Sequence, residues 1–282
     1  MDRQSDTLDT LHGRRSALLA AEALARGAGE LLLKHFGRLD AADVHSKSTG
    51  RDLVSTADVL AERFIVERLR KIFPEHAIEA EEETRDAVKM RDLRPRWFID
   101  SLDGTVNFVH GLPIFSVSMG LYSSLRDTPQ LRPEVAVVYV PRLDEMFTAF
   151  RGGGAYLNGR LIRVSNTANL ADAFLATGFP YRRNELRHNN LENFNKFFLD
   201  VRAIRRLGSA AMDLAYVAAG RFDGYWELHL SPHDVAAGAL LVREAGGIVR
   251  DCDGGDDWLR AGHVVASNPA LFEKIRERIV HR

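Results

Sequence analysis

Two aspartates three residues apart, Asp100 and Asp103, follow the apolar run 97–99. Burying two unpaired carboxylates is costly, so they cannot both point into an apolar core. Helix capping would explain one of them more easily than both. Gly104 and Thr105 come next and offer backbone N–H groups at an expected helix start, where phosphate groups bind well. The stretch therefore indicates a site for phosphate chemistry.

Further carboxylates fall at the expected boundaries of other regular elements. Asp58 lies in the first turn of an expected helix, and Asp234 opens a later one. Residues 81–83 are three consecutive glutamates after a short apolar segment. Singly, such residues are typical of solvated loops or of compensation for the helix dipole. Together they are the hard oxygen ligands that Mg²⁺ prefers, which indicates metal-assisted phosphoryl chemistry.

The order and type of these residues resemble the inositol monophosphatase family. Asp100-Ser-Leu-Asp103-Gly-Thr105 is similar to the family's Asp-Pro-(Ile/Leu)-Asp-Gly-Thr motif. His233-Asp234-Val-Ala-Ala-Gly, followed by Glu244-Ala-Gly-Gly, is similar to its Trp-Asp-x-Ala-(Ala/Gly)-Gly…Glu-Ala-Gly-Gly signature. The other matches are Glu81-Glu82 for a Glu-Glu pair, Gly208-Ser-Ala-Ala, Asp223-Gly-Tyr-Trp-Glu227 and the run from Lys47 to Asp58. A third glutamate leaves the register of the Glu-Glu pair open by one residue.

The resemblance implies a site for two or three Mg²⁺ ions and sensitivity to lithium. Glu81, Asp100 and the backbone carbonyl of Leu102 would bind the first ion. Asp100, Asp103 and Asp234 would hold the second. A third would be supported by Glu81 or Glu82 together with water ligands.

The resemblance also implies the roles of the remaining site residues. Thr105 and Asp58, together with Glu81, would orient and deprotonate the attacking water, and Gly104 and Thr105 would present N–H groups to the phosphate. The residues expected to contact the substrate are Asp103, Gly104, Thr105, Ser209, Ala210, Glu227 and Asp234.

Two positions depart from the family pattern. Ser101 stands where the family has proline, and the loss of the fixed φ angle predicts a looser Leu102 carbonyl. His233 replaces the family tryptophan, which exchanges an apolar wall for a polar ring. Cys252 is expected to be a packing residue, since a metal-assisted mechanism needs no covalent nucleophile.

The elements that must position these residues alternate between helix and strand, so the sequence predicts an α/β fold. Apolar spacing predicts a helix over 8–36 with Gly37 as its C-cap, and Thr56 is expected to cap a second helix that ends before Pro74. Asn158-Gly159 predicts a hairpin turn. The other expected strands are 97–99, 115–122, 135–140, 146–150, 173–178, 201–207 and 225–230, and the other expected helices are 186–198, 209–219 and 234–244.

The resemblance implies a layered αβαβα sugar-phosphatase arrangement, commonly dimeric. Residues 1–282 are expected to form a single inositol monophosphatase-like phosphatase domain. The layered topology is an implication of the resemblance, because periodicity alone predicts only the class.

Composition sets limits on partners and compartment. The 282 residues are 45% hydrophobic, enough for a sizeable core, and the net charge is −1, which disfavours nucleic acid as the main partner. One cysteine excludes an intrachain disulfide and suits a reducing compartment. No apolar run reaches the roughly 18 residues of a membrane span, and the polar N-terminus is no secretory signal. We expect a cytoplasmic protein.

The leading hypothesis is a Mg²⁺-dependent phosphatase acting on myo-inositol monophosphate or a similar small polyol phosphate, as a homodimer. Fructose 1,6-bisphosphate, histidinol phosphate and 3′-phosphoadenosine 5′-phosphate remain alternative substrates for the same chemistry. A different class is a regulatory role in transcription antitermination or ribosome assembly, which some similar bacterial proteins have. The basic segments 181–188 and 202–206 are candidates for such a role, although most basic clusters are solvated surface.

Overall fold

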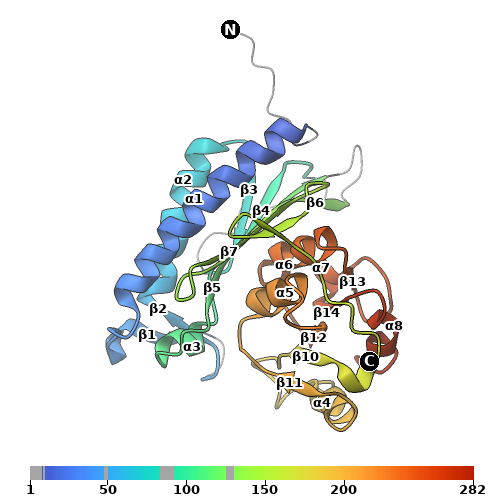
Figure 1. Cartoon of the computed structure of the whole chain (residues 1–282). Helices are drawn as coiled ribbons and strands as arrows, with labels where there is room; N and C mark the ends of the chain where they lie inside the picture. The colour runs from blue at the N-terminus through green and yellow to red at the C-terminus, as the bar shows by residue number, and fades with distance from the viewer. Residues whose placement is uncertain (1–7, 9, 48–49, 83–91, 125–129) are drawn as a thin grey trace.

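The computed structural model describes residues 8, 10–47, 50–82, 92–124 and 130–282. Five layers alternate between helices and sheets, so the predicted α/β class and layered αβαβα arrangement are confirmed (Figure 1). Two helices cover the outer face of a large sheet, two more lie between the sheets, and short helices cover the outer face of the small sheet.

The first layer consists of α1 (Leu11–His35) and α2 (Thr56–Ile72). In α1, Ala17, Ala21 and Ala28 are buried at helical spacing, and together with Leu32 they pack against the large sheet. Gly37, just after the helix, has a φ of 71°, so it occupies the left-handed conformation expected of a terminating glycine.

The second layer is the seven-stranded sheet. It is antiparallel except for β3 and β4, and strands β4 to β6 are almost completely buried because helices cover both faces. Its order is β3 (Ala77–Ala80), β4 (Arg96–Asp103), β5 (Ser116–Ser124), β6 (Leu131–Val140), β7 (Glu145–Phe150), β8 (Ala155–Leu157) and β9 (Arg160–Ile162). The hairpin predicted at Asn158-Gly159 is confirmed, since both residues have positive φ angles.

The middle layer consists of α5 (Ala210–Ala218) and α6 (Pro232–Glu244). Both helices are apolar on nearly all sides because sheets cover them on both faces. Gly120 on β5 allows a close approach, since a Cβ there would lie 2.9 Å from the Cβ of Ala236. The Tyr122 hydroxyl donates to the Ala236 carbonyl at 2.8 Å. These contacts fix the start of α6 over the large sheet.

The fourth layer is a five-stranded sheet, and the fifth consists mainly of short helices. A separate core joins these two layers around Phe197, Trp226 and Ile275. The sheet order is β11 (Ala203–Arg205), β10 (Phe174–Thr177), β12 (Gly224–Leu228), β14 (His263–Ser267) and β13 (Ile248–Arg250). The remaining elements are α3 (Thr105–Val109), α4 (Leu191–Phe198), α7 (Trp258–Ala261), α8 (Phe272–Arg276), the β1–β2 pair (Val44–Ser46, Leu53–Ser55) and two 3₁₀ helices (Ala41–Asp43, Leu170–Asp172).

The sequence prediction was wrong at a few boundaries. The helix expected over 186–198 begins only at Leu191, after Asn190 adopts a left-handed conformation. Ser55, not Thr56, caps α2. The strand expected to end at 99 continues to Asp103, because the pairing with β5 resumes there. Local propensity does not reveal such tertiary pairing.

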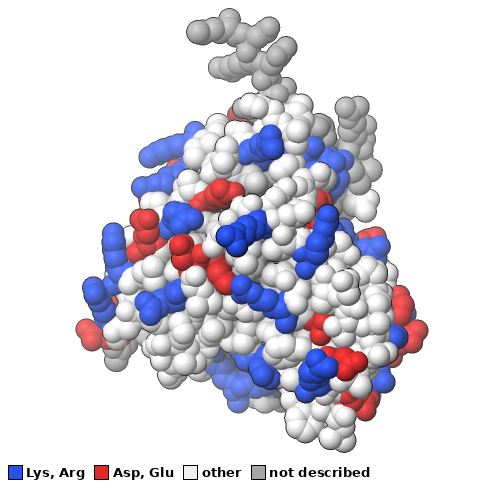
Figure 2. All heavy atoms as spheres, viewed as in Figure 1, with Lys and Arg blue, Asp and Glu red and all other residues white. Residues whose placement is uncertain are grey.

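Cys252 is buried in the small-sheet core, as expected for a packing residue. Burial, together with Asp251 and Asp253, raises the pKa of its thiol to about 12. Lys, Arg, Asp and Glu side chains are interspersed on the face shown in Figure 2. Among the described residues, no helix is both long and apolar enough to cross a membrane.

Candidate active site

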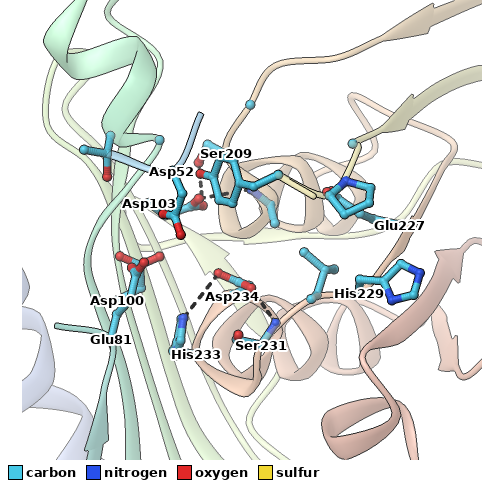
Figure 3. A pocket seen from close by; sticks show the side chains of 18 of the residues that line it. Asp52, Glu81, Asp100, Asp103, Ser209, Glu227, His229, Ser231, His233 and Asp234 are labelled. Carbon is cyan, nitrogen blue, oxygen red and sulfur yellow. Dashed lines mark hydrogen bonds and ion pairs between the residues drawn. The ribbon is translucent and has the colours of Figure 1, made fainter. Parts of the chain in front are cut away.

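A cavity of about 250 Å³ lies where the end of β4 meets the first turns of α3, α5 and α6 (Figure 3). We call it the acidic cavity. Except for Asp58 and the alternative ligand Glu82, every predicted site residue lines it. The structure brings together Glu81, Asp100, Leu102, Asp103, Gly104, Thr105, Ser209, Ala210, Glu227 and Asp234. Figure 3 shows Glu81 and Asp100 at one end and Glu227 at the other.

Asp100 and Asp103 share the cavity because β4 is irregular between them. On a regular strand, side chains three residues apart point to opposite faces. The register of β4 against β5 shifts between Asp100 and Asp103, which allows both carboxylates to line the same cavity. A bulge of this kind re-aims a side chain at the edge of a site.

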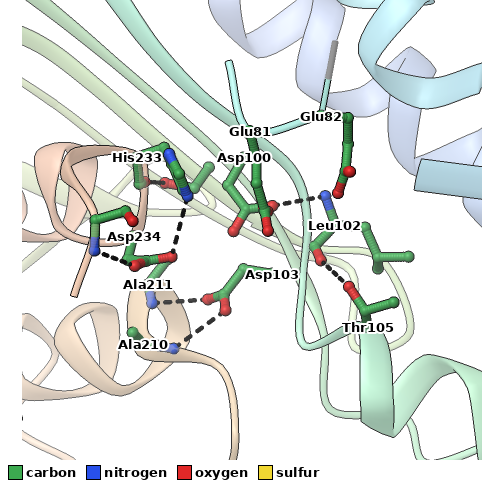
Figure 4. A network of polar contacts seen from close by, with 12 residues as sticks. Glu81, Glu82, Asp100, Leu102, Asp103, Thr105, Ala210, Ala211, His233 and Asp234 are labelled. Atoms are coloured by element: carbon green, nitrogen blue, oxygen red, sulfur yellow. Dashed lines mark hydrogen bonds and ion pairs between the residues drawn. The ribbon is translucent and has the colours of Figure 1, made fainter. Parts of the chain in front are cut away.

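Asp103 accepts hydrogen bonds from the start of α5 (Figure 4). The hydroxyl of Ser209 donates at 2.6 Å, and the N–H groups of Ala211 and Ala210 lie at 2.8 and 3.3 Å. Burial raises the pKa of Asp103 to about 7, although the Ser209 hydrogen bond acts against the rise. The interpretation that these aspartates cap the next helix is therefore wrong, since no described side chain caps α3 and Asp103 instead accepts from the N–H groups at the start of α5.

Asp100 is buried among the other metal-ligand candidates. Its pKa lies well above the usual range, first because of burial and then because of the charges of Glu81, Asp103 and Asp234. The Leu102 N–H donates to it at 3.0 Å. Four carboxylates in one buried space suit a divalent cation, which would relieve their repulsion. Within the described ranges, however, no group of three or more Asp, Glu, His or Cys side chains is arranged to hold a metal ion as the side chains stand.

The structure decides the register of the glutamate run. Glu81 lines the cavity and Glu82 does not, while Glu83 lies outside the described residues. The Lys47 ammonium contacts both, at 2.7 Å from Glu81 and 2.5 Å from Glu82. Burial would raise the pKa of Glu81, but His233 and Lys47 outweigh it and lower the pKa. The lowered pKa favours the carboxylate form of Glu81 beside Asp100.

Asp58 lies behind Thr105 and not in the cavity wall. The Thr105 hydroxyl contacts the Asp58 carboxylate at 2.9 Å and the Leu102 carbonyl at 3.1 Å. Asp58 also accepts from the N–H and hydroxyl of Ser55 as part of a capping box. Burial raises the pKa of Asp58 to about 6, against the hydrogen bonds of Ser55 and Thr105. Asp58 thus belongs to the capping box of α2, whose cap is Ser55, and also neighbours the site.

The two departures from the family pattern have structural consequences. The Ser101 hydroxyl donates to the Asp58 carbonyl at 2.9 Å, so a hydrogen bond holds the segment where the family has a stiff proline. His233 is buried, with Nε2 3.7 Å from a carboxylate oxygen of Asp234. The other carboxylate oxygen of Asp234 accepts from the Ser231 N–H at 2.6 Å. Both substitutions leave the carboxylates in place.

Two further carboxyl groups, those of Glu227 and Asp213, line the cavity. The Tyr225 hydroxyl donates to Glu227 at 2.5 Å, and burial raises the pKa of Glu227 to about 7. Asp213 is also buried there, and its Oδ1 has no hydrogen-bond partner in the described part of the chain. Sequence reasoning missed Asp213, because one acidic residue inside a helix carries no motif.

A family model, that of the inositol monophosphatase family, matches residues 14–281. The chain is 46% identical over 256 residues to the Nus factor SuhB of Pseudomonas aeruginosa, covering 89% of this chain and 91% of that protein. It is 45% identical over 258 residues to an inositol-1-monophosphatase of Mesorhizobium japonicum, covering 91% and 94%.

A crystal structure of the extragenic suppressor protein suhB from Bartonella henselae has the same fold, with a TM-score of 0.84 and 39% identity. The match covers 93% of this chain and 98% of that chain. The family match therefore extends over nearly the whole sequence, including all of the residues in the acidic cavity. The chain belongs to the inositol monophosphatase family, and with it to the phosphoric monoester hydrolases.

Proposed function

We propose that this protein is a Mg²⁺-dependent phosphomonoesterase that hydrolyses myo-inositol monophosphate or a similar small polyol or sugar phosphate through an activated water. The observation that carries the proposal is the position of four carboxylates from three segments of the chain around one cavity: Glu81, Asp100, Asp103 and Asp234. Carboxylate oxygens in such number suit Mg²⁺, and the family is metal-dependent.

We assign the metal ligands as the resemblance implies. Glu81, Asp100 and the Leu102 carbonyl would hold one ion, Asp100, Asp103 and Asp234 a second, and Glu81 or Glu82 would support a third. Bound there, Mg²⁺ would neutralise the charge of the phosphate and make water more acidic. The raised pKa of Asp100, caused by burial and its carboxylate neighbours, supports a cation at this position.

Thr105 and Asp58 would accept the proton of the attacking water. The Thr105 hydroxyl borders the cavity and contacts Asp58 at 2.9 Å, so it can pass a proton to the carboxylate behind it. A pKa of about 6 for Asp58, raised by burial, suits a base that works near neutral pH.

The phosphate would lie against the N–H groups of Gly104 and Thr105. Gly104 has a φ of 102°, and a Cβ there would lie 2.9 Å from the Ile114 carbonyl, so only glycine fits. The polyol hydroxyls would contact Glu227 and the start of α5 at Ser209 and Ala210, with Asp103 and Asp234 near the ester.

The test is phosphate release from a panel of monoesters, with Mg²⁺ and with excess EDTA after dialysis. We expect turnover only with Mg²⁺, and inhibition across a lithium titration. Hydrolysis that continues undiminished in EDTA would overturn the metal-dependent mechanism. An unchanged rate in lithium would contradict the kinship with lithium-sensitive inositol phosphatases.

A regulatory role is a second candidate, favoured by the 46% identity to a protein named Nus factor SuhB. Such a role would not need turnover. Pull-downs with wild type and with Asp103→Asn should then recover the same identified transcription or ribosome-assembly proteins. If neither the wild type nor Asp103→Asn recovers such proteins, and the monoesters are hydrolysed, only the catalytic role is supported.

We further propose a cytoplasmic homodimer in which residues 1–282 form one catalytic domain. The acidic cavity supports the single domain, because it takes residues from both the large-sheet and the small-sheet halves. The single buried thiol is consistent with a reducing compartment. Light scattering coupled to size exclusion tests the dimer directly.

A further inference from the structure

A second and larger cavity, of about 710 Å³, adjoins the acidic cavity. Phe179, Tyr181, Arg206 and Gly208 line both. Because the two cavities share these four residues, one molecule can extend from the first into the second. We call the second one the basic cavity.

The two linings have opposite charge. Seven Asp and Glu residues line the acidic cavity, with Lys47 and Arg206 as its Lys and Arg residues. In the described part of the chain, the basic cavity is lined by three arginines, Arg51, Arg183 and Arg206, and by no carboxylate. A lining of this kind attracts anions.

The side chains of Arg183 and Arg206 form no ion pair or hydrogen bond with any described residue. Arg51 donates to the Asn184 side chain at 2.6 Å, which joins the segments that carry Arg51 and Arg183. Guanidinium groups bind phosphate or carboxylate through paired N–H donors. Two such groups are therefore available to an anion in this cavity.

Gly208 makes room for Arg206 between the two cavities. A Cβ at Gly208 would lie 2.3 Å from Arg206 Nη1, and the φ of 87° also favours glycine. The charge of Arg206 opposes the rise in the pKa of Glu227 and Asp213 that burial causes. Arg206 therefore acts at the polyol end of the acidic cavity.

We infer that the natural substrate carries a second anionic group, a phosphate or a carboxylate, that binds Arg206, Arg183 and Arg51 while the ester phosphate lies in the acidic cavity. This rests on the proposed function and narrows its substrates to doubly anionic esters, which excludes myo-inositol monophosphate because it carries a single anionic group. The part of the substrate between the two anions contacts apolar side chains and can be a ring, since Leu53, Val106 and Leu191 line the basic cavity beside Phe179 and Tyr181.

The first experiment compares kcat/KM within matched substrate pairs, with Mg²⁺ present. The pairs are fructose 6-phosphate with fructose 1,6-bisphosphate, adenosine 3′-phosphate with 3′-phosphoadenosine 5′-phosphate, and glycerol 2-phosphate with 2-phosphoglycerate. The last pair tests a carboxylate as the second anion. We expect the doubly anionic member of at least one pair to be preferred about tenfold or more, and added KCl to reduce the preference because the arginines are exposed.

The second experiment removes single charges. Arg183→Gln should lower the ratio of kcat/KM between the doubly and singly anionic substrates about tenfold, and Arg206→Gln should lower it as well. Arg187→Gln is the matched control, since Arg187 is exposed in the same segment and lines neither cavity. We expect the ratio in Arg187→Gln to equal that of wild type.

The outcomes separate this inference from the proposed function. If singly anionic esters are hydrolysed but no pair shows a preference, the second-anion inference is overturned and the phosphatase stands. The second-anion inference is also overturned if Arg183→Gln keeps the wild-type ratio of kcat/KM. It is overturned as well if Arg183→Gln changes only the oligomeric state, because the basic cavity would then be an interface between subunits. If no ester is hydrolysed with Mg²⁺, the proposed function fails and this inference fails with it.

Discussion

The two adjoining cavities differ in charge and in how their charged groups are held. In the acidic cavity, Asp100 and Asp103 are buried, and backbone N–H groups or hydroxyls hold each of them. In the basic cavity, Arg183 and Arg206 are exposed on segments that lie outside the regular elements. The first arrangement suits chemistry that requires a fixed geometry. The second suits recognition, which tolerates motion.

The difference in burial also predicts how strongly substitutions and salt concentration affect the function of each cavity. Interactions among buried charges are stronger and less screened by salt than those among exposed charges. Substitutions in the acidic cavity should therefore cost orders of magnitude in turnover at any salt concentration. Substitutions in the basic cavity should cost about tenfold and depend on salt.

The largest effect is expected at Thr105. Thr105→Ala removes the hydroxyl that joins the cavity to Asp58, and turnover should fall roughly 10²–10⁴-fold. Thr105→Ser keeps that oxygen and should retain substantial activity. Single-turnover hydrolysis in ¹⁸O-labelled water should place the label in phosphate. Unlabelled phosphate, or a trapped phosphothreonine, would contradict the roles given to Thr105 and Asp58.

Asp103→Asn should lower turnover by roughly 10²-fold or more, since it removes one ligand charge with little change in volume. The amide oxygen can still accept from Ser209 and Ala211, so circular dichroism should not change. Asp172→Asn, at an exposed carboxylate paired with Arg202, is the control and should keep wild-type activity. Wild-type activity in Asp103→Asn would show that the metal site is misplaced.

Without divalent cations, stability should fall as pH rises from about 4 to 8. Burial raises the pKa of both Asp103 and Asp234 to about 7, above their unfolded values near 4. Between these values the folded chain binds more protons than the unfolded chain, so raising the pH destabilises it. At pH 8, Mg²⁺ at about a hundred times its Kd should raise Tm by roughly 5–10 °C.

At pH 5.5 the same Mg²⁺ concentration should raise Tm by less, because protons then compete for the carboxylates. Differential scanning calorimetry at both pH values measures the difference, and Asp103→Asn should reduce it. An equal rise in Tm at pH 5.5 and pH 8 would mean that these carboxylates do not bind the ion.

The smallest effect is expected at the boundary of the two cavities. Gly208→Ala and Gly246→Ala both place alanine at a φ near 90°, at a cost of about 1–2 kcal/mol each in urea unfolding. A Cβ at Gly246 meets nothing within 4 Å, whereas one at Gly208 meets Arg206. Only Gly208→Ala should therefore change the preference for doubly anionic substrates. An equal change in both variants would show that the contact with Arg206 does not determine that preference.

The family motifs were sufficient to predict the family, the fold class and five of the seven carboxylates that line the acidic cavity. Carboxylates beside a Gly-Thr pair are chemically unusual at any position in a chain, so their types and order carry the information. Helix α1 was predictable as well, since its buried alanines repeat at helical spacing. Boundaries such as the start of α4 were not, because the backbone of Asn190 is held by tertiary contacts of its side chain with Thr177 and Trp226.

By itself, the sequence determined which side chains can take part in the chemistry, because residue types and their order are known without the structure. Only the tertiary structure decided that Glu81 and not Glu82 faces the cavity, that an irregular β4 turns Asp100 and Asp103 to one side, and that Asp58 lies behind Thr105. It alone also placed Arg51, Arg183 and Arg206 around one cavity. The physical reason is that strand register, loop course and burial depend on packing between segments far apart in the chain, which local propensity does not encode.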